Sequence, residues 1–324
     1  MTIMLLVLTL LVGLVPRLAG QGAVSISDEW YLDTSDHCRL YVADYGTGPH
    51  TAIVLHGGWG AEHSYLLEAL AGLGDQFHFV LYDQRGSLRS PCPDSTISVA
   101  RMVQDLEELR QSLGETKVIL VGHSMGSYLA MAYLDAHADH LRGMVLLGAV
   151  QPRRARSPAD GPLWAETLQS DSLAQAFAMR PEVAAQLHQE GLDRSESALS
   201  GLQRTQLWRL RDVAAMNIYH IERWREVRGG RAFFNPAVSR AIIRSPAPGD
   251  FRIALARFAC RIQVILGDHD LIDMGGLMWQ RRAQELGNID LLILPDAGHL
   301  AWIDQPELFR TSLAAGLDRI AACA

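Results

Sequence analysis

A single serine stands between two glycines in the stretch "VGHSMGS", residues 121–127. Ser124 comes shortly after the apolar run "VILV" and precedes a run rich in Ala, Leu and Met, which predicts a strand before it and a helix after it. In that context G-x-S-x-G is typical of a serine on a sharp strand-to-helix turn, where small neighbours let other backbones approach. The pattern indicates that Ser124 is a nucleophile; a glycine-rich turn that only packs a helix on a strand is the structural alternative.

A serine hydroxyl is a weak nucleophile and needs a neighbouring base. His299, in "LPDAGHLAW", stands just past the last expected strand, and the glycine before it would let the imidazole reach toward Ser124. His123 is the neighbour of the serine and should point away from it, and His269 belongs to the loop that supplies the acid. His299 is therefore the expected base.

An acid must orient that base. The stretch "ILGDHDLID" offers Asp268, Asp270 and Asp273, and spacing alone does not choose among them. The chain order Ser, Asp, His is the order expected when an α/β scaffold carries this set. A cluster of Asp and His also raises the question of a metal site, but no matching cluster occurs elsewhere, so we expect no metal.

Backbone N–H groups must stabilise the oxyanion that forms when a serine attacks an acyl carbon. Met125 should supply one of them, because it begins the helix after the nucleophile. The second should come from "LHGGWG", residues 55–60, most plausibly from Gly58 with Trp59 as the alternative. The absence of G-x-x-x-x-G-K-[ST] argues against a loop that holds a nucleotide.

Short apolar runs alternate with helical segments around these residues. Two strand-like stretches, residues 29–34 and 38–46, predict a hairpin, and strands and helices then alternate up to about residue 150, including a helix over 61–73. Residues 151–257 contain no convincing strand, and the alternation resumes after them. We therefore expect a mostly parallel central sheet with helices on both faces, interrupted by a helical insertion.

These segments together resemble the α/β-hydrolase superfamily over the whole chain after its first 23 residues. The stretch "LYDQRGSLRS", residues 81–90, resembles the D-Q-R-G-x-G-x-S segment of the proline iminopeptidase family, peptidases that remove N-terminal residues. "HGGWG" is similar to the H-G-G-P-G of that family. The resemblance implies an α/β-hydrolase fold with Ser124 as nucleophile, Asp270 as acid and His299 as base, and it requires no metal or organic cofactor.

The resemblance also makes the insertion a cap over the active site, which in this family helps to hold the free amino group of the substrate through carboxylates. Glu166, Glu222 and Glu226 are candidates because each is near a tryptophan, and we assign Glu222 and Trp59 to substrate binding. Two departures from the family pattern are Trp59 in place of the proline and Leu88 in place of the second glycine.

Asp83 and Arg85 lie two residues apart in the D-Q-R-G segment. A carboxylate and a guanidinium so placed at a strand end more often brace loops than touch substrate, and we favour bracing.

Three functions remain open. The first is an aminopeptidase of proline iminopeptidase type, with a small molecule or short peptide as substrate. The second is a carboxylesterase or lactonase that uses the same triad, and the third is a non-catalytic binding protein on a hydrolase scaffold. An aspartate at the nucleophile position would have favoured halide or epoxide chemistry, and Ser124 speaks against both.

The 324 residues include 48% hydrophobic and 20% charged residues, which is the profile of a globular protein. The net charge of −7 comes without an acidic tail or a basic block, so we expect no nucleic acid as a partner.

The sequence predicts four segments: a signal peptide over 1–23, the first part of the hydrolase core over 24–150, a helical cap over 151–257 and the second part of the core over 258–324. The oligomeric state stays open.

The first residues contain an apolar run, 4–15, that fits the central region of a signal peptide and is short for a membrane span. No Lys or Arg precedes it, so a short membrane anchor and a misassigned start are alternatives to export. After removal of the leader we expect no stable membrane association.

Cys38, Cys92, Cys260 and Cys323 are widely spaced, without a C-x-x-C pair. If the protein is exported, one or two disulfides can form, and the sequence does not choose among the pairings. Buried free thiols are the alternative.

Overall fold

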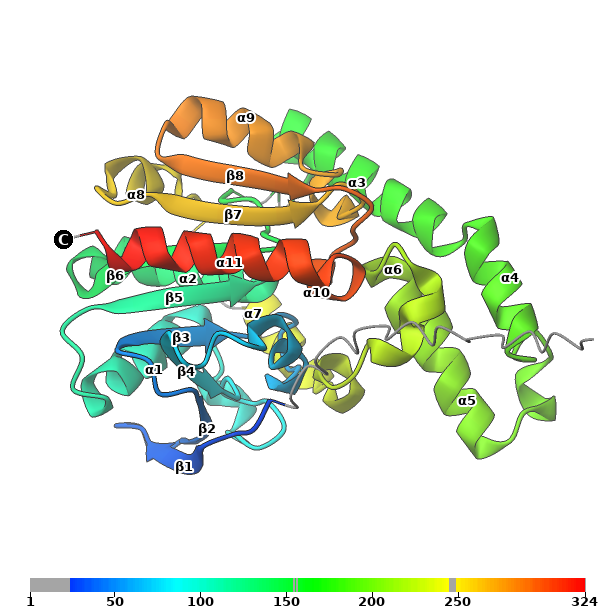
Figure 1. Cartoon of the computed structure of the whole chain (residues 1–324), viewed down its shortest axis with the longest axis horizontal. Coiled ribbons are helices and arrows are strands. Elements are labelled where there is room, and N and C mark those ends of the chain that lie inside the picture. Colours follow the sequence, from blue (N-terminus) through cyan, green and yellow to red (C-terminus); the bar gives the residue numbers. More distant parts are fainter. Residues whose placement is uncertain (1–23, 154, 156, 245–248, 324) are drawn as a thin grey trace, which may run out of the picture.

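The computed structural model describes residues 24–153, 155, 157–244 and 249–323, and the predicted signal peptide over 1–23 lies outside them. One sheet runs through the centre of the molecule (Figure 1). Its strands are β1 (Asp28–Asp33), β2 (Arg39–Tyr45), β3 (His50–Leu55), β4 (Phe77–Tyr82), β5 (Val118–His123), β6 (Leu141–Leu147), β7 (Ile262–Gly267) and β8 (Ile289–Leu294).

The strands lie in the order β1-β2-β4-β3-β5-β6-β7-β8. β1 and β2 form the predicted antiparallel hairpin, β2 pairs antiparallel with β4, and all later neighbours are parallel. Because β3, β5, β6, β7 and β8 run in parallel, their carboxyl ends meet at one edge of the sheet. The loops that carry the predicted chemistry all leave from that edge.

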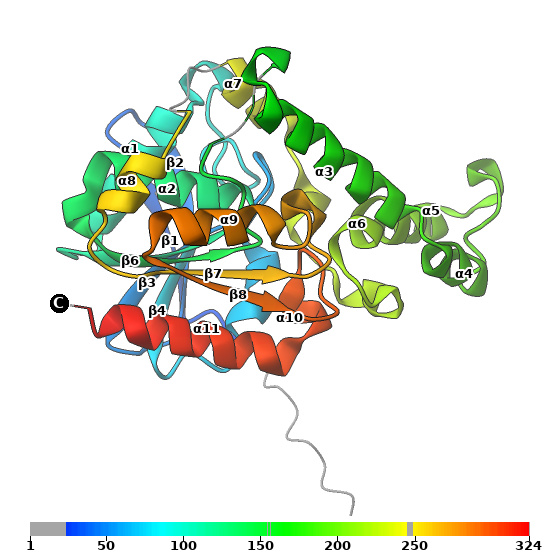
Figure 2. The same cartoon turned by 90° about the horizontal axis from the view of Figure 1, so that it is seen from above.

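Helices cover both faces of the sheet, as the two layers in Figure 2 show. The α-helices are α1 (Val99–Ser112), α2 (Met125–His137), α3 (Pro162–Ala178), α4 (Pro181–Gln189), α5 (Gly201–Leu207), α6 (Ala215–Asn217), α7 (Pro236–Arg244), α8 (Arg252–Arg257), α9 (Leu277–Leu286), α10 (Ala301–Asp304) and α11 (Pro306–Ala321). Helices α1, α2, α8 and α9 pack on the face that carries Ile53 and Leu55, and α10 and α11 on the face that carries Ala52 and Val54. This confirms the predicted α/β architecture.

The helical insertion leaves the sheet after β6 and returns before β7. Helices α3 to α6 extend beyond the carboxyl ends of the strands (Figures 1 and 2), and a π-helical stretch over Trp208–Ala214 continues α5. A bridge between Arg153 and Asp250 joins the two ends of the insertion. Helix α8 packs against α2 and α9, so the last turn of the predicted insertion belongs to the core layer.

The helix predicted over 61–73 is wrong. The structure has only two 3₁₀ turns there, Ser64–Leu66 and Glu68–Leu70. Carboxylates bind the backbone N–H groups at the start of this segment, because Asp83 accepts from His63 and Glu62 accepts from Ser64. Such local acceptors compete with the hydrogen bonds of a helix.

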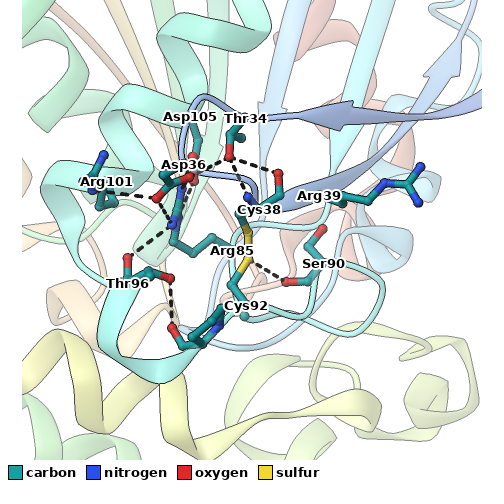
Figure 3. The surroundings of a disulfide bond; sticks show 12 residues. Thr34, Asp36, Cys38, Arg39, Arg85, Ser90, Cys92, Thr96, Arg101 and Asp105 are labelled. Carbon is teal, nitrogen blue, oxygen red and sulfur yellow. Dashed lines mark hydrogen bonds and ion pairs between the residues drawn. A yellow bond between two sulfur atoms is a disulfide. The ribbon is translucent and has the colours of Figure 1, made fainter.

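Two disulfides pair the four cysteines as Cys38–Cys92 and Cys260–Cys323. The first joins the end of the β1–β2 turn to the loop after the D-Q-R-G segment (Figure 3). The second joins a residue just before β7 to the end of α11, 63 positions away. Closing loops of this length restricts the unfolded chain, so both bonds should stabilise the fold.

Arg85 lies beside the first disulfide and is 1% exposed (Figure 3). Its guanidinium donates to both carboxylate oxygens of Asp36 at 2.8 and 3.0 Å and to both of Asp105 at 2.9 and 2.5 Å. The hydrogen bonds from Arg85 hold the pKa of Asp36 well below its usual range. Arg85 therefore braces the β1–β2 turn against α1.

Within the described residues, no helix combines the length and the apolar character needed to cross a membrane.

Replacing Arg85 with Met should lower the free energy of unfolding by about 3–5 kcal/mol, because the buried Asp105 and the partly buried Asp36 lose the guanidinium that pairs with them. Urea unfolding would measure the change. The matched control is Arg101→Met at the same corner, where Arg101 is half exposed and 3.8 Å from Asp36; that loss should stay below about 1 kcal/mol. Equal effects of the two substitutions would contradict the bracing role.

Candidate active site

Ser124 occupies the turn between β5 and α2 with φ 53° and ψ −120°, a backbone conformation that side chains rarely adopt. Three glycines allow other backbones to crowd around it. A Cβ on Gly126 would lie 2.1 Å from the carbonyl oxygen of Leu55, and a Cβ on Gly57 would lie 2.7 Å from the Cβ of Ser124. A Cβ on Gly122 would lie 2.6 Å from the carbonyl oxygen of Gly126. Both glycines of G-x-S-x-G are thus required by packing.

His299 and Asp270 meet at the ends of neighbouring strands, in the loops after β8 and β7. His299 Nδ1 lies 3.0 Å from Asp270 Oδ2, and both side chains are buried. Gly148, after β6, makes room for them, since a Cβ there would lie 2.8 Å from the imidazole ring. An imidazole that donates its Nδ1–H to a carboxylate presents Nε2 as the basic atom.

The two other aspartates of this loop have different partners. Asp268 lies 2.7 Å from the ring of its neighbour His269 and accepts from the backbone of Ala297. Asp273 accepts from Gln151 and from the backbone N–H of Trp279. The structure thus brings only Asp270 of the three to His299.

A cavity of about 700 Å³ opens above these residues, and both Ser124 and His299 line it. The expected oxyanion donors lie beside them, because Gly58 and Met125 line the same cavity. Trp59 also lines it, and its ring packs edge-on against Tyr128 with 6.2 Å between the ring centroids. The predicted nucleophile, base and oxyanion donors therefore face one space.

The insertion forms the far wall of this cavity. Its contribution is mostly apolar or small, and the lining residues from it include Val213, Met216, Asn217, Val227, Arg228, Gly229, Gly230, Phe234, Ser239, Ile242 and Ile243. No aspartate or glutamate of the described residues, which include every Asp and Glu of the chain, lines the cavity.

The three carboxylates considered for an amino group lie elsewhere. Glu222 is 64% exposed and pairs with His220 at 3.3 Å. Glu226 pairs with Arg223, and Glu166 with Arg281, each at 2.7 Å. The structure therefore gives no support to the assignment of Glu222 to substrate binding, whereas Trp59 does lie in the cavity.

Two buried carboxylates, Asp304 and Glu62, attach the insertion to the loops that line the cavity, and no motif in the sequence singled them out. Asp304 accepts from the backbone N–H of Gly298, next to His299, at 2.8 Å, and from those of Tyr219 and His220 in the insertion at 2.8 and 2.9 Å. Its partner groups are up to 85 residues away, so no local pattern could have revealed it.

Glu62 has the same role on the other side of the cavity. Its carboxylate accepts from the backbone N–H of Ser64 at 2.8 Å and from that of Gly230 in the insertion. Each carboxylate is nearly inaccessible to solvent and is stabilised there by hydrogen bonds from N–H groups. The insertion is thus attached beside His299 and beside the loop after β3, residues 55–60, which the sequence analysis expects to supply an oxyanion donor.

Among the residues that the structure describes, two groups of side chains have the spacing to hold a metal ion: Glu62, His63 and Asp83, and separately Glu107, His137 and His140. In the first, His63 binds Asp83 at 2.7 Å and the Glu62 oxygens accept backbone N–H groups. In the second, a bidentate Arg110 already neutralises Glu107. The structure thus assigns these carboxylates to internal hydrogen bonds, and none of the six side chains lines the cavity that holds Ser124 and His299.

Burial raises the pKa of Asp273 to about 8, and the nearby charge of Asp270 acts in the same direction. In the unfolded chain the same carboxyl titrates near 3.8. Between these values the folded state binds more protons than the unfolded state, so this group makes stability fall as pH rises from about 4 to about 8.

Replacing Asp273 with Asn removes that titration. The free energy of unfolding of the native protein should therefore fall with pH more steeply than that of the variant, by up to about 1.4 kcal/mol per pH unit between about pH 5 and 7. Urea unfolding at several pH values would measure both slopes. The exposed Asp171→Asn is the control and should keep the native slope; parallel curves for Asp273→Asn would contradict the raised pKa.

The family model described as the alpha/beta hydrolase fold matches residues 51–306. Among curated proteins, a proline iminopeptidase of Saccharolobus solfataricus is 40% identical over 98 residues, 29% of this chain and 31% of that protein. A 1-acylglycerol-3-phosphate O-acyltransferase of Arabidopsis thaliana is 28% identical over 138 residues, 40% of this chain and 33% of that protein. The matches thus span about a third of the length of these relatives.

Solved structures share the fold along nearly the whole chain. An esterase from Exiguobacterium antarcticum has a TM-score of 0.62 at 18% identity, covering 89% of this chain and 98% of its own. A proline iminopeptidase-related protein from Thermus thermophilus has a TM-score of 0.59 at 23% identity, covering 90% of this chain and 99% of its own. Because the family model spans most of the chain and the structures share its fold, the protein belongs to the α/β hydrolase family.

Proposed function

We propose that the protein is a serine hydrolase in which Ser124 is the nucleophile, His299 the base and Asp270 the acid that orients it. The observation that carries this proposal is the hydrogen bond between His299 and Asp270, combined with the position of Ser124 on a positive-φ turn in the same cavity. Such a set of three groups is the recurring arrangement for acyl transfer by serine.

In the proposed reaction the Oγ of Ser124 attacks the acyl carbon of the substrate while His299 Nε2 takes its proton. The N–H groups of Gly58 and Met125 stabilise the oxyanion of the tetrahedral intermediate. The intermediate collapses, the bond to the leaving group breaks, and His299 returns the proton to that group. Water, activated by His299, then attacks the acyl-serine, releases the acid and restores Ser124.

For the substrate we propose an uncharged acyl ester or lactone. A free amino group is cationic at neutral pH, and its burial needs a paired carboxylate. The cavity offers no such group among the described residues, and its insertion wall is largely apolar. Esterases and an N-acyl homoserine lactone degrading enzyme are among the solved structures with this fold.

An aminopeptidase is the second candidate, because a specific observation favours it. Proline iminopeptidases of Saccharolobus solfataricus and Xylella fastidiosa are the curated relatives with 40% and 36% identity over their matched segments. Those segments cover only 31% and 41% of the relatives, so the match does not extend the relatives' substrate preference to this protein.

Replacing Ser124 with Ala should lower kcat for an ester such as p-nitrophenyl butyrate by about 10⁴-fold or more, because the nucleophile is lost. Steady-state assays would measure it. Ser112→Ala removes a hydroxyl that donates to the Leu109 carbonyl on α1 and should leave kcat unchanged. Full activity of Ser124→Ala would overturn the proposal.

A second assay separates the two substrate classes. We expect turnover of p-nitrophenyl esters at a kcat/KM at least about 100-fold above that for prolyl and alanyl arylamides, since an unpaired buried ammonium costs several kcal/mol. Acetylating the amine of the arylamides should not lower their slow turnover. Fast release from prolyl arylamide that is abolished by acetylation would favour the aminopeptidase instead.

A further inference from the structure

Tyr65 and His123 connect the oxyanion loop to the peptide of the base through a chain of hydrogen bonds. The N–H of Gly57 donates to the hydroxyl of Tyr65 at 2.7 Å, and that hydroxyl lies 2.7 Å from His123 Nδ1. On its other side, His123 Nε2 lies 3.2 Å from the carbonyl oxygen of His299. Gly57 and His299 are remote from each other in the sequence, and the side chains of Tyr65 and His123 join them.

The series of hydrogen bonds begins at the N–H of Gly57 and ends at the carbonyl of His299, and these two groups fix the direction of every bond between them. A carbonyl can only accept, so His123 must carry its proton on Nε2 and donate to His299. Burial holds the pKa of His123 well below its usual range, so the ring is neutral and its Nδ1 must accept. Tyr65 therefore donates to Nδ1 and uses its lone pair to accept from Gly57, whose N–H can only donate.

Two further hydrogen bonds, both made by the ring of His56, hold the other side of the loop over residues 55–60. The backbone N–H of Gln84, in the D-Q-R-G segment, donates to His56 Nε2 at 3.1 Å, so the neutral His56 carries its proton on Nδ1. That nitrogen lies 3.0 Å from the carbonyl oxygen of Gly57. The carbonyl of Gly57 and the N–H of Gly58 belong to one planar peptide, so fixing one orients the other.

Packing keeps these groups in place. His123 is 3% exposed, and its ring lies 4.5 Å from that of His299 and 5.0 Å from that of Trp302, measured between centroids. The side chain of Gln84 also donates to the carbonyl of His56 at 2.8 Å. Both ring nitrogens of His56 and of His123 have a hydrogen-bond partner, so each ring is held in one orientation.

We propose that Tyr65 and His123 are positioning residues that hold the base and the oxyanion loop at a fixed separation. The proposal rests on the proposed serine hydrolase function. In the proposed reaction His299 takes the proton of Ser124 while Gly58 stabilises the charge on the acyl oxygen, so both groups must be in place at the same time. A displacement of about 1 Å between catalytic groups can cost about 100-fold in rate. Neither side chain needs to touch the substrate for this role.

The test is Tyr65→Phe, which keeps the ring and removes the one hydroxyl that links Gly57 to His123. We expect kcat for p-nitrophenyl butyrate to fall about tenfold to a hundredfold, because the reacting groups are displaced. Tyr65 lines the cavity, but Phe keeps its ring there, so KM should change less than about twofold. The matched control is Tyr45→Phe, which removes another tyrosine hydroxyl that accepts from a glycine N–H, that of Gly72, and should keep the native kcat.

A second measurement uses the native protein and does not depend on the variant. The ¹⁵N spectrum should show His123 as the Nε2–H tautomer, and in Tyr65→Phe the Nδ1 resonance should shift because its donor is gone. An Nδ1–H tautomer in the native protein, or a kcat for Tyr65→Phe equal to that of Tyr45→Phe, would overturn the proposal. A native protein without any esterase activity would contradict the proposed function instead, and the tautomer would still test the hydrogen-bond chain.

Discussion

The close approach of three backbones around Ser124 is the constraint on which the rest of the site depends. Ser124, at φ 53°, faces the cavity because the start of α2 lies against the end of β3. This contact requires glycine at position 126, since a Cβ there would overlap the carbonyl of Leu55. The same contact places Gly57 against Ser124. The same backbone contacts therefore position both the loop over residues 55–60 and Ser124.

The insertion is held to this centre by buried carboxylates that accept backbone N–H groups. Asp304 links the loop of the base to residues 219 and 220, and Glu62 links the oxyanion loop to Gly230. Leu300, next to the base, donates to the carbonyl of Asn217 at 2.8 Å. Because a buried carboxylate without these donors would be costly, the insertion and the catalytic loops are expected to move together.

Much of the fold could be predicted from the sequence because its strands are continuous apolar runs and its helices have a clear period. Ser124 and His299 could be located for a related reason, since each follows such a strand closely. Spacing alone could not choose among the three aspartates, because side chains two or three positions apart on a turn point in different directions. The family resemblance pointed to Asp270, and the structure brings Asp270 of the three to His299.

Other features could not be predicted because their partners are remote in the chain. Tyr65 meets His123 across 58 positions and Asp304 meets Tyr219 across 85, and neither Tyr65 nor Asp304 belongs to a motif. The assignment of Glu222 to substrate binding has no support in the structure, for the opposite reason. It depended on a nearby tryptophan in the sequence, whereas in the structure Trp224 is buried and Glu222 faces solvent beside His220.

The most direct test of the central claim is covalent labelling of the native protein with a fluorophosphonate, followed by intact-mass measurement and peptide mapping. A serine activated by His299 and Asp270 should take up one phosphonyl group per chain, located on Ser124. Labelling should be lost when His299 is replaced by Ala, because the hydroxyl then has no base. An unlabelled protein, or a label on another residue, would contradict the account.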